Sequence, residues 1–219
     1  MKRDHPVFTR TYGVIAAVGE RVGLGRLRAS VLADARGRLL IVGLGPGHDL
    51  DHLPAAVSSV MALEPSESMR VAAQARVRSA GDRGIAIDVV DAPAERIPLP
   101  DDSVDSVLVA YVLCSVDDPR AALAELRRVL RRGGTLHVLE HVRARPGSVI
   151  RGLQRCVAPV WPLFAGGCQV DRQTGVLLEE AGFDVSGIKE TRIMALPPVA
   201  PTLVGVARPI GRDVADTGM

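Results

Sequence analysis

Three glycines stand at alternate positions directly after a short apolar run, in the segment LLIVGLGPGHDL. Gly43, Gly45 and Gly47 leave room where the backbone must approach a ligand closely or adopt a positive φ. The next apolar run ends at Glu64, whose carboxylate can accept hydrogen bonds from both hydroxyls of a ribose. This pattern predicts a site for a nucleotide-containing cofactor. A tight strand-to-helix turn without a ligand is the alternative.

The glycine spacing bears on which cofactor the loop could hold. A dinucleotide fingerprint, G-x-G-x-x-G, places its third glycine at position 48, where this chain has His48. The observed G-x-G-x-G suits S-adenosylmethionine (SAM), which has no pyrophosphate to bind. The spacing therefore favours SAM over NAD.

Histidines are the candidate proton acceptors. His141 ends a predicted strand at the presumed rim of the site, where it could act as a general base or simply cap the strand. His137 lies on the same face further inside and is interpreted as a core histidine with satisfied hydrogen bonds. We expect His48 and His52 to be solvated residues near the glycine loop.

The elements that position these residues alternate along the chain. Apolar runs predict strands at 38–43, 57–64, 85–90, 103–113 and 135–142, with two closing strands at 183–193 and 202–207. Amphipathic segments predict helices over 7–33, 66–81 and 118–132, and a further helix from an N-cap at Asp171 to Gly182. This order predicts an α/β fold, a doubly wound Rossmann-like seven-stranded sheet whose last strand pair is antiparallel.

Composition limits the classes of partner. The chain has 219 residues, of which 47% are hydrophobic and 24% charged, and its net charge is +2. We expect a single domain over 1–219 and no nucleic-acid partner, because no long basic block is present. The cluster RRVLRR is interpreted as the basic end of a helix.

The cysteines and the apolar segments bear on compartment. Cys114, Cys156 and Cys168 show no C-x-x-C spacing, so we expect reduced thiols and no metal site. Cys114 and Cys168 are interpreted as small buried hydrophobes, with a role in lining the site as the alternative. The N-terminus lacks a signal-peptide core, and no apolar run reaches the ~20 residues needed to cross a bilayer. We therefore expect a cytoplasmic protein, with contact at a membrane surface left open.

Four blocks in order from about residue 38 to 184 resemble the class I SAM-dependent methyltransferases. They are IVGLGPG with LEPSESM, APAERIPLPDDSVDSVLVAYVLCSV, ALAELRRVLRRGGTLHVLEHV, and AGGCQVDRQTGVLLEEAGF. The resemblance is closer to the methyltransferase type 11 group. The narrower VLCSV, LEHV and GGC motifs resemble its alkyl-thiol methyltransferase branch. The resemblance implies the class I methyltransferase fold and SAM as cofactor.

The resemblance also implies roles for individual residues. The methionine part of SAM would be wrapped by Gly43, Leu44, Gly45 and Gly47, and the ribose bound by Glu64. The residues implied to lie beside the adenine are Pro65, Met69, Ala94 and Glu95. Those near the sulfonium are Ala110 and Tyr111, and Tyr12 belongs to an N-terminal helical cap over 1–36 that closes on the cofactor.

Two positions depart from the family pattern. The acidic residue usual two positions before the first glycine, which helps to anchor the methionine ammonium, is Ile41 here. Asp49 could compensate from the start of the next helix. Pro46 replaces the commoner threonine of the loop and stiffens it.

The acceptor is predicted less sharply than the donor. Methyl transfer is an in-line displacement that depends mainly on positioning. The scarcity of buried bases favours a thiol, which at a pKa of ~8.5 is already partly ionised at neutral pH. A lid over 143–170, rich in Val, Trp, Pro, Leu and Phe, implies a lipophilic small-molecule acceptor. A monomer or a homodimer is expected.

Other functions stay open at this point. One is an N-, O- or C-methyltransferase of a lipid amine or a quinone-like substrate, whose lid docks on a membrane. Another is a SAM-binding protein without catalysis, which the residue Ile41 makes conceivable. An NAD oxidoreductase is the most distant alternative.

Overall fold

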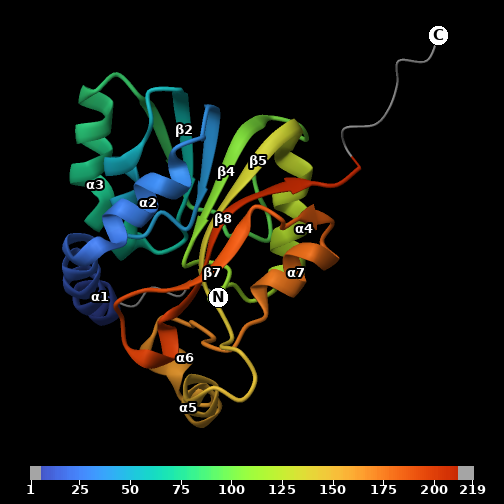
Figure 1. Ribbon diagram of the computed structural model, residues 1–219. Coiled ribbons are helices and arrows are strands. Elements are labelled where there is room, and N and C mark those ends of the chain that lie inside the picture. The colour runs from blue at the N-terminus through green and yellow to red at the C-terminus, as the bar shows by residue number, and fades with distance from the viewer. Residues whose placement is uncertain (1–5, 212–219) are drawn as a thin grey trace.

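The computed structural model describes residues 6–211, apart from the side chains of residues 6–8, 10, 11 and 14 (Figure 1). Its centre is one sheet with the strand order β3-β2-β1-β4-β5-β8-β6, and β7 also pairs with β8. β1 to β5 run parallel, and β8 is antiparallel to β5, β6 and β7. The strands are β1 (Gly37–Val42), β2 (Val57–Leu63), β3 (Ala86–Val90), β4 (Val104–Ala110), β5 (Leu130–His141), β6 (Phe183–Asp184), β7 (Ile188–Arg192) and β8 (Pro201–Pro209). The predicted doubly wound fold with an antiparallel end is confirmed.

Helices cover both faces of this sheet. α2 and α3 lie on one face of the sheet, and α4 and α7 lie on the other. α1, α5 and α6 lie below the ends of the strands in this view (Figure 1). The helices are α1 (Pro6–Gly19), α2 (Gly25–Leu32), α3 (Glu67–Asp82), α4 (Pro119–Val129), α5 (Val149–Val157), α6 (Trp161–Phe164) and α7 (Thr174–Glu180). Shorter segments are η1 (Glu20–Leu24), η2 (His48–His52) and η3 (Pro197–Val199). None of the helices between residues 6 and 211 is long and apolar enough to cross a membrane.

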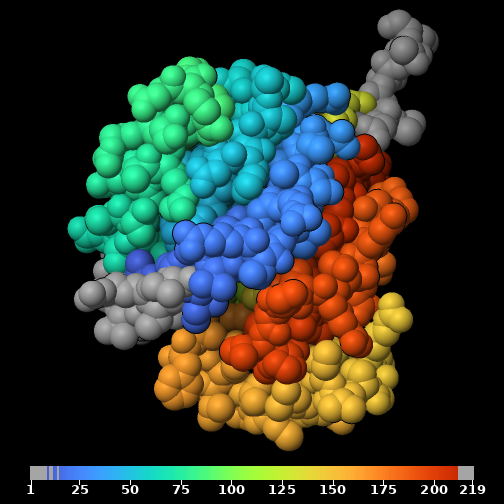
Figure 2. Space-filling view, turned by 60° about the vertical axis from the view of Figure 1, so that its left-hand side comes forward, coloured from blue at the N-terminus to red at the C-terminus, as the bar shows by residue number. Residues whose placement is uncertain are grey.

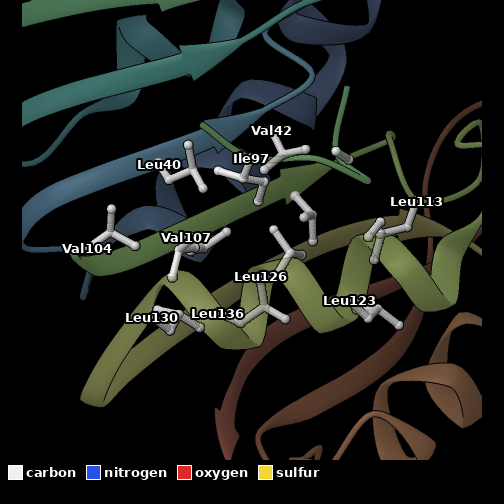
Figure 3. Close-up of a cluster of buried hydrophobic side chains, with 14 of the residues drawn as sticks. Leu40, Val42, Ile97, Val104, Val107, Leu113, Leu123, Leu126, Leu130 and Leu136 are labelled. Atoms are coloured by element: carbon white, nitrogen blue, oxygen red, sulfur yellow. The ribbon is translucent and has the colours of Figure 1, made fainter. Parts of the chain in front are cut away.

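The core has two layers because successive strand residues face opposite ways. Leu39 and Ile41 of β1 pack in a cluster with α2 and α3. Leu40 and Val42 pack in the other cluster, with Leu126 of α4 (Figure 3). Each such fully buried side chain contributes roughly 1.5–3 kcal/mol relative to exposure. Burial on both faces explains why the parallel strands read as continuous apolar runs.

The start of α4 follows its sequence signals, but its end does not. The Asp118 side chain accepts hydrogen bonds from the N–H groups of Arg120 (2.9 Å) and Ala121 (3.0 Å), as an N-cap does. The helix was predicted to reach residue 132 but ends at Val129, and the chain passes directly into β5 at Leu130. The RRVLRR cluster is therefore divided between a helix end and a strand.

Two further boundaries differ from the predictions. The closing strand predicted over 183–193 is split into β6 and β7 by a turn in which the Asp184 carboxylate accepts a hydrogen bond from the Ser186 N–H (2.9 Å). The helix predicted to begin at an Asp171 N-cap begins only at Thr174. The Asp171 carboxylate instead lies 3.6 Å from Arg151 and 3.8 Å from Arg143. An ion pair has therefore replaced the cap.

The N-terminal cap predicted over 1–36 comprises α1 and α2, and its first five residues lie outside the described part of the chain. The two helices are separated at Gly23, whose φ is 129°. The lid predicted over 143–170 contains α5 and α6. Gln154 fixes α5, since its buried amide donates to the carbonyls of Val142 (3.0 Å) and Val170 (2.8 Å). The assignment of the whole chain to one domain remains a prediction.

Candidate active site

A cavity of about 1660 Å³ lies where the parallel strands end. It is lined by the loops after β1, β2, β3 and β4, by the N-terminal helices, and by the segments around α6 and β7. Figure 2 shows a recess between the blue N-terminal helices and the orange and red segments of the C-terminal half. Ordinary ligand sites measure ~300–1,000 Å³, so this one has room for a cofactor and a second molecule.

The glycine loop has the backbone that its sequence predicts. Gly43, Gly45 and Gly47 have φ values of 69°, 54° and 83°. A Cβ atom on Gly43 would come within 2.6 Å of Val112, whereas one on Gly45 would meet nothing within 4 Å. Gly47 packs against Ala73 of α3 and does not line the cavity. The loop therefore presents bare backbone to the cavity at Gly45.

Glu64 connects the glycine loop to the start of α3. Its buried carboxylate accepts hydrogen bonds from the Gly45 N–H (2.8 Å) and the Ser66 N–H (2.9 Å). Ser66 caps α3 by accepting a hydrogen bond from the N–H of Met69 (3.3 Å). Glu64, Pro65 and Met69 all line the cavity. The structure thus brings together the predicted ribose ligand and two of the residues predicted beside the adenine.

A buried ion pair that the sequence did not reveal lies beside the glycine loop. Asp49 is 4% exposed, and its Oδ1 lies 2.5 Å from Nη1 of Arg28, which is also 4% exposed. Arg28 Nε donates to Glu20 Oε1 (2.7 Å), and its guanidinium carbon lies 5.7 Å from the centre of the Tyr111 ring. Arg28 and Asp49 both line the cavity. Arg28 comes from a helix whose sequence position gives no sign of this contact.

The position of Ile41 bears on how the methionine ammonium could be held. Ile41 is 1% exposed and packs in the apolar cluster against α2 and α3, away from the cavity lining.

His48, expected to be solvated, is 6% exposed, and burial lowers its pKa. That expectation was wrong for His48, which is the first residue of η2, is buried and lines the cavity.

The loop after β4 is fixed by Glu140, a residue that sequence reasoning missed. Glu140 is fully buried, and its Oε1 accepts hydrogen bonds from the N–H groups of Val112 (2.8 Å) and Leu113 (2.7 Å). Its Oε2 accepts from the N–H of Cys114 (3.3 Å). Burial raises the pKa of Glu140, and these backbone donors act in the opposite direction. The LEHV motif contained a signal that could have identified Glu140, because it places a carboxylate inside an otherwise apolar strand.

Two more side chains hold the same loop from other directions. Buried Arg172 donates from Nη1 to the carbonyls of Leu113 (2.5 Å) and Val116 (2.9 Å). Glu95, predicted beside the adenine, accepts hydrogen bonds from the N–H groups of Asp117 (3.0 Å) and Asp118 (3.2 Å). The loop over residues 112–118 is therefore held by side chains from three other segments of the chain.

His141 lies at the end of the cavity formed by this loop and the α6 segment. Its ring is 4.3 Å from that of Tyr111, centre to centre, and its Nδ1 is 3.9 Å from Cys168 Sγ. Cys114 belongs to the same group, and hydrogen bonding to Cys168, followed by burial, raises the pKa of its thiol. Tyr111 has a φ of 60°, and burial raises the pKa of its hydroxyl.

Tyr12 and His137 illustrate a cavity residue and a core residue. Tyr12 lines the cavity, and burial raises its pKa to about 12. His137 is fully buried and hydrogen-bonds to the Val31 carbonyl (2.7 Å) and to Thr135 Oγ1 (3.0 Å), which confirms its core interpretation.

All the site residues predicted from the sequence line the cavity except Gly47. Those that do are Tyr12, Gly43, Leu44, Gly45, Asp49, Glu64, Pro65, Met69, Ala94, Glu95, Ala110, Tyr111 and His141. Their individual roles remain predictions.

Comparison with known proteins agrees with this arrangement. Residues 40–138 match a family described as a methyltransferase domain. Human thiol S-methyltransferase TMT1B is 39% identical over 120 residues, which are 54% of this chain and 49% of that protein. A demethylmenaquinone methyltransferase of Clavibacter sepedonicus is 33% identical over 142 residues, or 65% of this chain and 55% of that protein. The chain thus spans about half the length of these curated relatives.

A solved structure is similar over nearly the whole chain. It is a SAM-dependent methyltransferase of Thermotoga maritima, described as a possible histamine N-methyltransferase, with a TM-score of 0.65 and 23% identity. The likeness covers 92% of this chain and 95% of that one, and at this identity it shows the fold alone. The domain match and the curated relatives agree on methyl transfer, and SAM is the cofactor that they imply. Over residues 40–138 the sequence is therefore similar to methyltransferase domains, and nearly the whole chain has the fold of a solved methyltransferase structure.

Proposed function

We propose that this protein transfers a methyl group from SAM to the sulfur of a lipophilic small-molecule thiol. The observation that carries the proposal is that one continuous cavity joins two chemically different ends. One end has the glycine loop with Glu64, and the other has His141 beside two buried cysteines. The similarity to thiol S-methyltransferases supports sulfur as the methylated atom.

The residues present fit the cofactor. Glu64 would bind the ribose, since each oxygen of a carboxylate can accept more than one hydrogen bond. Arg28 and Asp49 present opposite charges to the cavity, and they suit the carboxylate and the ammonium of the methionine part, respectively. Asp49 then takes the place of the acid that Ile41 does not supply. Ala110 and Tyr111 would lie near the sulfonium, and Tyr12 would close over it.

The chemistry that SAM supplies when bound is a methyl group activated by a positive sulfonium. The reaction of a thiolate with this group cancels charge, so an apolar and dry cavity favours the transition state. His141 would take the thiol proton, and the proposal is supported by its half-buried ring, which lines the cavity beside Tyr111 and Cys168. The rigid loop after β4 then holds the acceptor in line with the methyl group.

The lipophilic character of the acceptor is also part of the proposal. Trp161, Phe164 and Leu196 line this part of the cavity, and Phe164 is 79% exposed and Leu196 64% exposed. Exposed apolar side chains at a cavity mouth are suited to an apolar substrate or to a membrane surface. The cytoplasmic location, the contact with a membrane surface and the choice between monomer and homodimer remain predictions.

Replacing His141 by alanine should lower kcat by about 100-fold or more, the usual contribution of a general base, with little change in SAM affinity. The reason is that the imidazole lies at the acceptor end and away from Glu64 and the glycine loop. Steady-state kinetics with a small thiol and calorimetric titration with SAM measure both quantities. Unaltered kinetics would return His141 to a structural role as a strand cap.

Product analysis with isotope-labelled SAM tests the proposed function itself. A panel of thiols, amines, phenols and reduced quinones is incubated with the full chain, and the labelled atom is located by mass spectrometry. Methyl on sulfur is expected. Methyl on carbon of a quinone would favour the second candidate, which the demethylmenaquinone methyltransferase similarity supports. Tight SAM binding without any labelled product would indicate a binding protein and contradict the proposal.

A further inference from the structure

Three side chains with metal-binding atoms meet at the acceptor end of the cavity. Cys114 lies in the loop after β4, His141 is the last residue of β5, and Cys168 follows α6. One ligand atom of each lies within 4.8 Å of the other two, and Cys168 Sγ is 3.9 Å from His141 Nδ1. Both cysteines are buried and neither forms a disulfide.

The backbone around these three residues is fixed by contacts of its own. The Cys114 N–H donates to Glu140, and its carbonyl accepts from the N–H of Gln169 (2.8 Å), next to Cys168. His141 is held in the sheet by its pairing with Thr202 of β8. The three ligand atoms are therefore brought together by the fold and not by flexible surface side chains.

The donor set has a definite chemical preference. Two thiolates and one imidazole bind thiophilic divalent cations, and zinc above all. A tetrahedral zinc ion with bonds of ~2.0–2.3 Å separates its ligand atoms by roughly 3.5–3.8 Å, so the observed group needs to contract only slightly. Sites with three protein ligands and one open position are characteristic of catalytic zinc, whereas structural sites have four ligands. Cys114, His141 and Cys168 all line the cavity.

We propose that Cys114, His141 and Cys168 bind one thiophilic divalent cation, Zn²⁺ in the first place, with the open fourth position facing the acceptor end of the cavity. The binding site depends only on these three residues. Its role in catalysis rests on the proposed function: the acceptor thiol would occupy the open position.

The acceptor thiol displaces water from the cation, its S–H bond breaks, and the proton leaves to solvent. The bound thiolate forms the new S–CH₃ bond with its own electron pair as the methyl group leaves the sulfonium, whose C–S electron pair stays on the departing sulfur. The thioether product is a weaker ligand and dissociates. In the metal-loaded chain, His141 is a ligand, and the cation takes over the activation that the imidazole supplies in the metal-free chain.

Metal binding is measured on the full chain, reduced and freed of metal by a chelator. Titration with Zn²⁺ against a chromophoric zinc chelator should give one equivalent per chain. Titration with Co²⁺ should give the charge-transfer absorption of thiolate-bound cobalt. Mutating a residue that only hydrogen-bonds to a metal ligand typically lowers metal affinity ~10–100-fold, and losing a ligand should lower it further. We therefore expect C114S, C168S and H141Q each to weaken Zn²⁺ binding by over ~100-fold. Cys156 is exposed on α5, and the matched variant C156S should bind like the wild type.

The outcomes separate the metal site from the proposed function. Reduced wild-type chain that binds no Zn²⁺ and gives no thiolate–cobalt band overturns the site, even if thiols are methylated. The site is also overturned if C114S and C168S bind Zn²⁺ as tightly as the wild type and have melting temperatures near that of the wild type. One bound zinc without methylation of any thiol leaves the site standing and contradicts the proposed function. Methylation that Zn²⁺ does not accelerate contradicts only the catalytic role of the cation.

Discussion

Replacing Glu64 by alanine is expected to raise the Kd for SAM by at least ~100-fold, which corresponds to about 2.7 kcal/mol. Hydrogen bonds to a charged group contribute ~1.5–3 kcal/mol each, and Glu64 would accept two from the ribose. The same carboxylate also binds the N–H groups of Gly45 and Ser66. Its removal therefore loosens the glycine loop as well as removing a ligand contact. Calorimetric titration with SAM measures the change.

A matched variant separates these effects from a general change in charge. Glu67 is an exposed carboxylate in the first turn of α3, three residues from Glu64 in sequence. Glu67→Ala should leave the Kd for SAM within about twofold of the wild-type value. Substitutions of exposed surface residues usually change free energies by under ~0.5 kcal/mol. Equal affinity of Glu64→Ala and the wild type would remove the ribose assignment.

Replacing Glu140 by alanine is expected to lower the free energy of unfolding by ~3–5 kcal/mol, because each buried N–H left without a partner costs ~1–3 kcal/mol. The three donors are those of Val112, Leu113 and Cys114. For a protein of this size the loss corresponds to a fall in melting temperature of about 10 °C. Methyl transfer should fall further than SAM affinity, because the displaced loop forms the acceptor end. Thermal unfolding and kinetics on the same preparation measure both.

The conservative variant Glu140→Gln tests whether hydrogen bonding is the cause. Its carbonyl oxygen can still accept the bonds from Val112 and Leu113, while its NH₂ group faces the N–H of Cys114. We expect a loss of stability smaller than that of Glu140→Ala, with kcat lowered more than SAM affinity. Glu179, exposed on α7, serves as the control carboxylate, and Glu179→Ala should unfold like the wild type. A Glu140→Ala protein as stable as the wild type would show that water or a shifted loop satisfies the three donors.

Local signals in the sequence were sufficient for the five parallel strands and for the backbone of the glycine loop. The run LLIV is buried on both faces of β1, as continuous apolar runs in parallel sheets are. The three glycines have the positive φ values that their spacing predicts, because only glycine adopts that backbone without a steric penalty. Element ends were less predictable. Asp171 looked like a helix cap but pairs with Arg143 and Arg151, which come from a distant part of the sequence.

By itself, the sequence predicted the fold class from its periodicity. It predicted the cofactor from the glycine and acidic positions together with the resemblance to the class I methyltransferases. Only the tertiary structure decided the rest of the cavity. Arg28 meets Asp49, Glu140 meets the loop after β4, and Cys114 meets Cys168 beside His141. The absence of C-x-x-C spacing predicted no metal site, yet the fold assembles two thiols and an imidazole from three separate segments. Such contacts depend on how strand ends and loops converge at one edge of the sheet, which local spacing does not encode.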